Sequence, residues 1–280
     1  MNKIVSIKNL EFRYKKQEEL FKRFNLTIHT GCINGLLGIN GEGKTTLIKL
    51  IAGLLFPIDG DVYVKNFETK KRSPKMLQDI FLLPEEIQET DLNINTYQAI
   101  YAPFYPKFSV TQFRTYLNDF AIDTGVPGIS TLSYGQKKKF HIAFGLATNA
   151  NLILLDEPTN GLDIPSKRQF RRMIAAAVTP GSSIVISTHQ VNDLEDMVDN
   201  VIILDRHEII FNQLTETIVN KLHFSTQSAY DSDKEILYSE QGTEGYQTIR
   251  ENKLGEKSKL DLELLFNAVI SDHHRIRELF

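Results

Sequence analysis

The sequence predicts an α/β fold in which helices cover the faces of a largely parallel sheet. From residue 33 to residue 204, apolar segments of strand length alternate with segments of helical apolar spacing. Parallel strands need long crossover connections, which helices usually supply, so both faces of the sheet are covered. We therefore expect one α/β domain over residues 1–211. It should carry an N-terminal antiparallel β subdomain and an inserted helical subdomain at about 90–147.

The individual elements follow from local patterns. Strands are expected at the short apolar or alternating runs, which are 4–7, 10–14, 24–28, 33–37, 60–64, 80–83, 152–155, 184–187 and 201–204. Helices are expected where apolar residues recur every three or four positions, at 45–55, 94–101, 110–120, 137–147, 164–177 and 191–198. These signals weaken after residue 211, and residues 225–258 are mostly polar. We expect 212–280 to be an appended segment of unknown role, partly mobile, that closes with an amphipathic helix around 260–279.

Composition narrows the class of protein. Of the 280 residues, 41% are hydrophobic and 24% are charged, and the formal net charge is −3. This balance argues against a free-standing nucleic-acid binder, which usually carries a basic excess. No run approaches the ~18 apolar residues of a membrane span, and the N-terminus lacks the layout of a secretion signal. We therefore expect a soluble chain that stays in the cytoplasm where it is made, and that would need another protein to bring it to a membrane.

The single cysteine, Cys32, lies in an apolar run. Cysteine in such a run usually behaves as a small hydrophobic residue, so we expect Cys32 to be a core residue rather than a nucleophile. One cysteine cannot form a disulfide within the chain, which fits a reducing compartment.

A glycine-rich motif follows the expected strand at 33–37 and opens the next helix. Its sequence from Gly38 to Thr45, GINGEGKT, matches the phosphate-binding loop (P-loop). Glycines let successive amide groups face a phosphate, and the helix N-terminus points at the same anion. The alternative, a strand-to-helix turn with Gly and Lys by chance, is disfavoured by this strand–loop–helix context. We predict that ATP is bound by Gly38, Asn40, Gly41, Gly43, Lys44, Thr45 and Thr46.

Lys44 and Thr45 have specific expected roles. Lys44 should reach the β- and γ-phosphates and act in catalysis, and the Thr45 hydroxyl should ligate Mg²⁺. Asp156 and Glu157 end the apolar strand at 152–155. Asp156 is expected to hold Mg²⁺ beside the P-loop, and Glu157 to polarise the attacking water as a general base. The alternative, a solvated acidic turn, is disfavoured by the P-loop earlier in the chain.

His189 follows the strand expected at 184–187. A lone histidine is usually structural or lies on the surface. At the end of a third core strand of a P-loop protein, it is a candidate sensor of the γ-phosphate that also positions the attacking water.

The segment LSYGQ at 132–136 resembles the signature motif of ATP-binding cassette (ABC) ATPases, which is usually LSGGQ. The run PTNGLD at 158–163 is similar to the stretch from the Walker B motif through the D-loop. His189 matches the switch histidine of that family, and Tyr14 takes the place of the aromatic residue that stacks on adenine. The resemblance covers residues 1–211 and keeps the family's order of motifs.

The resemblance implies an ATPase that works as a head-to-tail dimer, with a second copy of itself or with a related chain. In such a dimer, residues of one copy would complete the ATP site of the other; these are Ser133, Gly135, Gln136 and Asp163. It also implies a separately encoded integral membrane subunit of a transporter. ATP would close the dimer, closure would be relayed to that subunit, and hydrolysis would reopen the dimer.

The chain departs from the family pattern at two positions. Tyr134 replaces the first glycine of the signature, but the donors at Ser133 and Gly135 remain, so we expect function to survive. Glu85 follows Pro84 where many members carry the Q-loop glutamine. The sequence LLPEE resembles the exporter-type branch, in which glutamate takes that place, and Glu85 is expected to contact Mg²⁺. The alternative is that Glu85 caps the next segment.

The helical stretch carries five aromatic residues close together: Tyr97, Tyr101, Phe104, Tyr105 and Phe108. They are more than a small helical layer needs to bury, and aromatic residues often anchor interfaces. We expect them to form a docking surface for the membrane subunit. The alternative is that all five are core residues.

Two other functions compete with an exporter ATPase. A soluble ABC protein of translation or DNA repair would usually carry two cassettes or long coiled coils, and this chain shows neither. A degenerate cassette that binds ATP as a regulatory subunit is disfavoured by the presence of Lys44, Asp156, Glu157 and His189.

Overall fold

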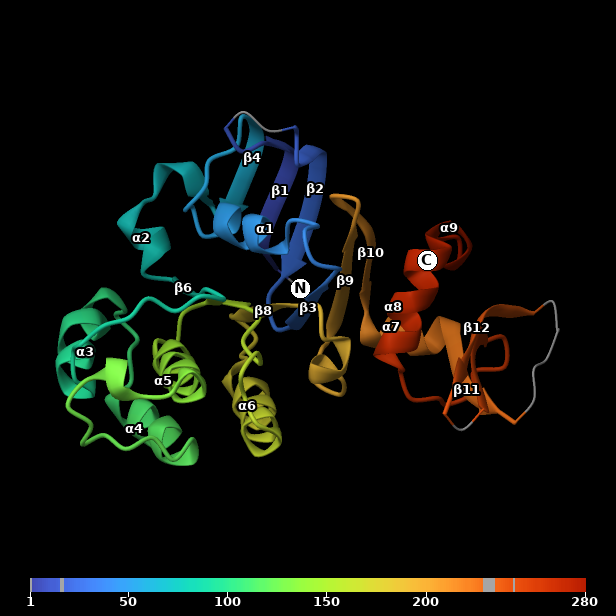
Figure 1. Ribbon diagram of the computed structural model, residues 1–280. Coiled ribbons are helices and arrows are strands. Elements are labelled where there is room, and N and C mark those ends of the chain that lie inside the picture. Colours follow the sequence, from blue (N-terminus) through green and yellow to red (C-terminus); the bar gives the residue numbers. More distant parts are fainter. Residues whose placement is uncertain (1, 16–17, 229–234, 244) are drawn as a thin grey trace.

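The computed structural model describes residues 2–15, 18–228, 235–243 and 245–280, in which the strands form three sheets (Figure 1). The central sheet has the strand order β10-β9-β3-β8-β7-β6. Its strands are β3 (Ile33–Leu37), β6 (Ile80–Leu83), β7 (Leu152–Asp156), β8 (Ser183–Thr188), β9 (Asn200–Asp205) and β10 (Glu208–Leu214). All neighbours pair in parallel except β9 and β10. Every residue of β3, β7 and β8 is buried, as a sheet covered on both faces requires. The predicted parallel sheet is confirmed.

An antiparallel sheet of order β2-β1-β4-β5 forms the N-terminal layer, also as predicted. It consists of β1 (Lys3–Phe12), β2 (Phe21–His29), β4 (Asp59–Val64) and β5 (Phe67–Glu68). The prediction of two separate strands at 4–7 and 10–14 was wrong, because β1 runs through both. A register shift between Ile7 and Leu10 interrupts the alternation without ending the strand. Within it, Asn9 adopts a left-handed backbone and donates its amide to the Asn25 side chain.

Helices α1 (Lys44–Ile51) and α2 (Pro74–Leu77) connect the two sheets, and α6 (Ile164–Ala177) connects β7 to β8 within the central sheet. The apolar side chains of α1 pack in one core with the N-terminal sheet and with β7. The helix expected at 191–198 was wrong, because only a 3-10 turn at Val191–Leu194 forms. Glu195 is extended and Asp196 has a left-handed backbone, so the helix cannot continue.

The inserted helical layer contains α3 (Ile94–Tyr101), α4 (Val110–Asp119) and α5 (Tyr134–Ala147), which lie together in Figure 1. Their predicted positions are confirmed, although α5 begins three residues earlier than expected. Ser133 is the reason: its hydroxyl accepts the amide of Gln136, whose side chain accepts the amide of Ser133. This capping box sets the start of the helix at the signature segment.

The five aromatic residues of this layer do not form one exposed cluster. Tyr97, Tyr105 and Phe108 are partly buried and pack against Phe144 of α5. Tyr101 and Phe104 remain 40% and 66% exposed. The expected docking surface is therefore reduced to its exposed members, since burying an aromatic ring in the helical core is worth several kcal/mol by itself.

The C-terminal segment is more organised than its composition suggested. After α7 (Thr215–Lys221) it forms a three-stranded antiparallel sheet of order β11-β13-β12. The strands are β11 (Leu222–Gln227), β12 (Ile236–Gly242) and β13 (Gly245–Glu251). This sheet was not predicted from the sequence, because polar cross-strand pairs hold part of it. Ser225, for example, pairs with Thr248 through their hydroxyls, 2.9 Å apart.

The helix expected around 260–279 is divided in two, α8 (Leu262–Ser271) and α9 (His273–Arg277). Apolar residues of α8 belong to the same core as β9. Asn192, in the 3-10 turn at Val191–Leu194, donates its side-chain amide to Glu263 of α8. The expected domain boundary after residue 211 falls inside β10. Of the stretch expected to be partly mobile, residues 229–234 and 244 lie outside the described residues.

Candidate nucleotide-binding site

Three neighbouring strands of the central sheet bring the predicted site residues together. β3 pairs with β8 and β8 pairs with β7, all in parallel, so their carboxyl ends meet at one edge. The P-loop follows β3, Glu157 follows β7, and His189 follows β8. Ligands of open α/β sheets bind at such an edge.

The P-loop is held from inside by its own lysine. The Lys44 ammonium donates to the carbonyl oxygens of Gly38 and Ile39 at 2.6 and 2.9 Å. Burial lowers the pKa of Lys44, and the nearby carboxylates, Glu157 first among them, oppose this effect. Gly41 and Gly43 have φ of 92° and 102°, a region that favours glycine, so the loop can curl with its tip exposed.

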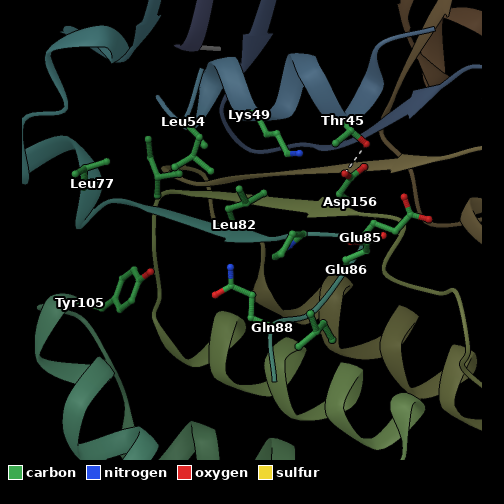
Figure 2. A pocket seen from close by; sticks show the side chains of 14 residues that line it. Thr45, Lys49, Leu54, Leu77, Leu82, Glu85, Glu86, Gln88, Tyr105 and Asp156 are labelled. Carbon is green, nitrogen blue, oxygen red and sulfur yellow. Dashed lines mark hydrogen bonds between the residues drawn. The ribbon is translucent and has the colours of Figure 1, made fainter. Parts of the chain in front are cut away.

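Asp156 bridges the P-loop helix and β8. One carboxylate oxygen accepts from the Thr45 hydroxyl at 2.7 Å, drawn as a dashed line in Figure 2, and the other accepts from the Ser187 hydroxyl. Asp156 is 2% exposed. Two of the three residues predicted to ligate Mg²⁺, Thr45 and Asp156, are therefore in direct contact.

Glu157 is buried, and three groups hold its carboxylate. Thr188 donates its hydroxyl to one oxygen at 3.0 Å. The other oxygen accepts the amide of His189 at 3.0 Å and lies 2.8 Å from the His189 ring nitrogen Nδ1. Glu157 itself has a φ of 46°, which is uncommon for a residue with a side chain. Ser187 and Thr188 were not predicted as site residues; their one signal in the sequence was their place at the end of a core strand beside His189.

Glu85 follows β6 and lines the same cavity as Thr45 and Asp156, which has a volume of about 1010 Å³ (Figure 2). Its carboxylate accepts from the Asn160 side chain at 3.5 Å, and Asn160 in turn accepts from Gln190 at 3.3 Å. Glu85 is thus close to the predicted metal ligands and connected to the loop after β7.

The signature residues lie elsewhere. Ser133 is exposed and, with Gly135 and Gln136, forms the first turn of α5; none of the three lines the cavity shared by Thr45 and Asp156. Asp163 caps α6 by accepting the amide of Ser166 at 2.8 Å. Hydrogen bonding from the Ser166 side chain, and then from its amide, lowers the pKa of Asp163. The structure therefore gives Asp163 a capping role, and its predicted contact with ATP remains a prediction.

Comparison with known proteins assigns the family. The family model described as ABC transporter matches residues 21–160. The ABC transporter ATP-binding protein YtrB of Bacillus subtilis (strain 168) is 32% identical over 227 residues, which cover 80% of this chain and 76% of the relative. The chain belongs to the ABC transporter family of ATP-binding proteins. As a member of this family it is an ATP-binding ATPase.

Other relatives of this ABC ATPase carry different names. ABC transporter ATP-binding protein NatA of B. subtilis (strain 168) is 30% identical, over 73% of this chain and 85% of the relative. Molybdate import ATP-binding protein MolC of Haemophilus influenzae (strain ATCC 51907 / DSM 11121 / KW20 / Rd) is 29% identical, over 79% and 87%.

Solved structures share the fold of this ABC ATPase. An ATP-binding subunit of an ABC transporter matches with a TM-score of 0.69 at 22% identity, over 77% of this chain and 91% of that one. A dimeric ATP-binding cassette in a post-hydrolysis state, bound to ADP and Pi, matches with a TM-score of 0.66 at 24% identity, over 75% and 98%. Both likenesses confirm the predicted ABC ATPase fold.

Tyr14, predicted to stack on adenine, lies next to the P-loop helix in this ABC ATPase. Its hydroxyl is 2.9 Å from the hydroxyl of Thr46, and its ring meets Phe12 edge-on at 5.1 Å. Tyr14 is 38% exposed, and its predicted contact with adenine remains a prediction.

The described part of the chain lacks two further features. No helix there is long and apolar enough to span a membrane. No cluster of three or more His, Cys, Asp or Glu side chains is arranged to hold a metal ion by itself.

Proposed function

We propose that this ABC ATPase drives a separately encoded membrane subunit of an exporter by closing and reopening an ATP-dependent dimer. One observation carries the proposal. The strand-end residues Asp156 and Glu157 are buried and bonded within the chain, whereas the first turn of α5 at Ser133 is exposed, outside the cavity that Asp156 lines. A helix N-terminus offers free amides to an anion, and a second chain could bring its own γ-phosphate there.

The residues at the strand ends suit binding and hydrolysis of MgATP. Mg²⁺ usually binds through one or two carboxylates together with substrate phosphates and water, and here Thr45, Glu85 and Asp156 would hold it. When bound, the ion would neutralise charge on the phosphates. Lys44 would leave its loop carbonyls to contact the β- and γ-phosphates.

Glu157 would accept a proton from the attacking water, and His189 would position that water near the γ-phosphate. The hydrogen bonds from the Thr188 hydroxyl and from the His189 amide fix the position of the Glu157 carboxylate at the end of the strand. We propose nucleotide contacts for Tyr14 and for the P-loop residues Gly38, Asn40, Gly41, Gly43 and Thr46.

The cavity beside Glu85 suits a segment of the membrane subunit. Its lining combines apolar residues from four parts of the chain with the Glu85 and Glu86 carboxylates (Figure 2). The apolar members include Leu54, Leu77, Leu82, Ile87 and Tyr105. Tyr101 and Phe104 are exposed on the same helical layer. A partner docked there would place the chain at the inner face of the membrane. Export rather than import is inferred from Glu85 in LLPEE, which resembles the exporter-type branch. The direction rests on this segment because the relatives of the chain include a molybdate import protein.

The test is nucleotide-dependent assembly of the purified chain. We expect a monomer without nucleotide and a dimer of the Glu157→Gln variant with MgATP, measured by light scattering, because ATP is then bound but not consumed. Adding Ser133→Arg should abolish the dimer and leave ATP binding by the monomer intact. Ser271→Arg, at the exposed end of α8, is the matched control and should dimerise normally. If the Ser133→Arg protein still forms dimers, the assignment of the signature surface is wrong.

A further inference from the structure

The main-chain carbonyl oxygen of Glu85 accepts two hydrogen bonds from α5. One comes from the Tyr134 hydroxyl at 3.2 Å and the other from the Lys138 ammonium at 2.9 Å. The two donors are four residues apart, so they lie on one face of the helix. The ammonium of Lys138 is also 5.7 Å from the centre of the Tyr134 ring.

Lys138 is an unusual donor because its side chain is fully buried, at 0% exposure. Burial lowers the pKa of Lys138, an effect that the charges of Glu85, Asp156 and Glu157 oppose. Its hydrogen-bond partner is nonetheless a neutral carbonyl, not one of these carboxylates. Burying an ammonium costs free energy that an apolar side chain would not, so packing alone does not account for lysine here.

Tyr134 also contacts the D-loop. A Cβ atom at Gly161 would come within 2.7 Å of the Tyr134 ring, so the ring occupies the space that a side chain at 161 would need. Asn160, the preceding residue, donates to the Glu85 carboxylate at 3.5 Å. Glu85 is therefore bonded through its main chain to α5 and through its side chain to the D-loop.

We propose that Tyr134 and Lys138 are positioning residues that hold Glu85 to α5, so that the signature turn, the Glu85 segment and the D-loop move as one body. This gives Tyr134 a reason to stand where the family pattern has glycine, since glycine could not reach the Glu85 carbonyl. Any effect of this attachment on Mg²⁺ binding rests on the role proposed above for Glu85. The attachment of Glu85 to α5 does not rest on that role.

The attachment is tested on nucleotide-free protein by hydrogen-exchange mass spectrometry of residues 84–89. Tyr134→Phe keeps the ring and removes the hydroxyl, and exchange in this segment should become about fivefold faster, as for the loss of one neutral hydrogen bond. Lys138→Met keeps the length of the stem and removes the charged donor, and exchange should rise about tenfold or more. Tyr116→Phe, which removes a hydroxyl from α4, should leave these residues unchanged. Exchange at the wild-type rate in either test variant overturns the proposal; if Lys138→Met does not fold, Tyr134→Phe decides.

A second measurement separates positioning from mere packing. In steady-state ATPase assays, Tyr134→Phe should raise the Mg²⁺ concentration for half-maximal rate about fivefold and leave KM for ATP at saturating Mg²⁺ unchanged, because the P-loop is not altered. Faster exchange with an unchanged Mg²⁺ requirement would overturn the positioning role. It would leave the proposed ATPase cycle standing, because that cycle depends on the dimerisation test above.

Discussion

The strand-end side of the nucleotide site and its signature side differ in how completely this chain satisfies their polar groups. Asp156 and Glu157 are 2% and 4% exposed, and each carboxylate accepts hydrogen bonds from residues at the end of β8. On the signature side, Ser133 is exposed and Tyr134 is 49% exposed. Buried polar groups need hydrogen-bond partners within the fold, whereas exposed polar groups can bond to water and remain available to a ligand or a second chain. Substitutions on the two sides should therefore fail in different ways.

The largest expected effect is on chemistry at the buried side. Glu157→Gln keeps the shape of the side chain but removes the proton acceptor. Turnover by purified protein should fall at least ~100-fold, within the range for losing a positioned base, while ATP affinity is retained. Glu251→Gln, at the exposed end of β13, should turn over normally. Near-normal turnover by Glu157→Gln would reject Glu157 as the base.

The same contrast between buried and exposed residues divides the aromatics of the helical layer. Tyr97 is enclosed by rings of Tyr101, Phe140, His141 and Phe144, and burial raises its pKa. Tyr97→Ser should cost ~3 kcal/mol of unfolding free energy, as for emptying a buried aromatic site. Tyr101→Ser and Phe104→Ser should each stay within about 0.5 kcal/mol, as surface changes do, but should reduce membrane recruitment in cells. If both leave recruitment intact, the membrane subunit does not dock on these two side chains.

Lys44→Ala should weaken ATP binding itself, whereas Glu157→Gln should impair only the chemical step. The substitution removes the charge meant for the β- and γ-phosphates, together with the hydrogen bonds to Gly38 and Ile39. The Kd for ATP should rise about tenfold or more, as for losing charge-assisted hydrogen bonds. Lys22→Ala, on the exposed side of β2, is the control for a lost surface charge. An unchanged Kd in equilibrium binding would show that Lys44 does not touch the nucleotide in the ground state.

The nucleotide site was predictable to the extent that its parts are contiguous in the chain. Gly38 to Thr45 connect strand β3 to helix α1, and the local backbone conformation of this loop, together with Lys44, is enough to define the motif. Thr45 and Asp156 are 111 positions apart, yet their contact was predictable from the order of the motifs along the chain. Parallel strands end at one edge of a sheet, so two motifs that each follow a strand must lie near each other.

The contacts that the sequence did not reveal depend on packing between elements with no shared motif. The residues around Lys138 in the sequence do not indicate that its ammonium would be buried against the carbonyl of Glu85. The aromatic residues could not be sorted into Tyr97, which packs inward, and Phe104, which does not, because both lie in one polar and aromatic stretch.

By itself, the sequence determined the fold class, the P-loop and the order of the motifs, since each depends on local backbone preference and apolar periodicity. Only the tertiary structure decided which side chains hold Glu157, that Tyr134 and Lys138 share the Glu85 carbonyl, and that 222–251 contain a sheet. The physical reason is that these features arise from hydrogen bonds between segments distant in the chain, whose polar residues look the same in sequence whether they face water or each other.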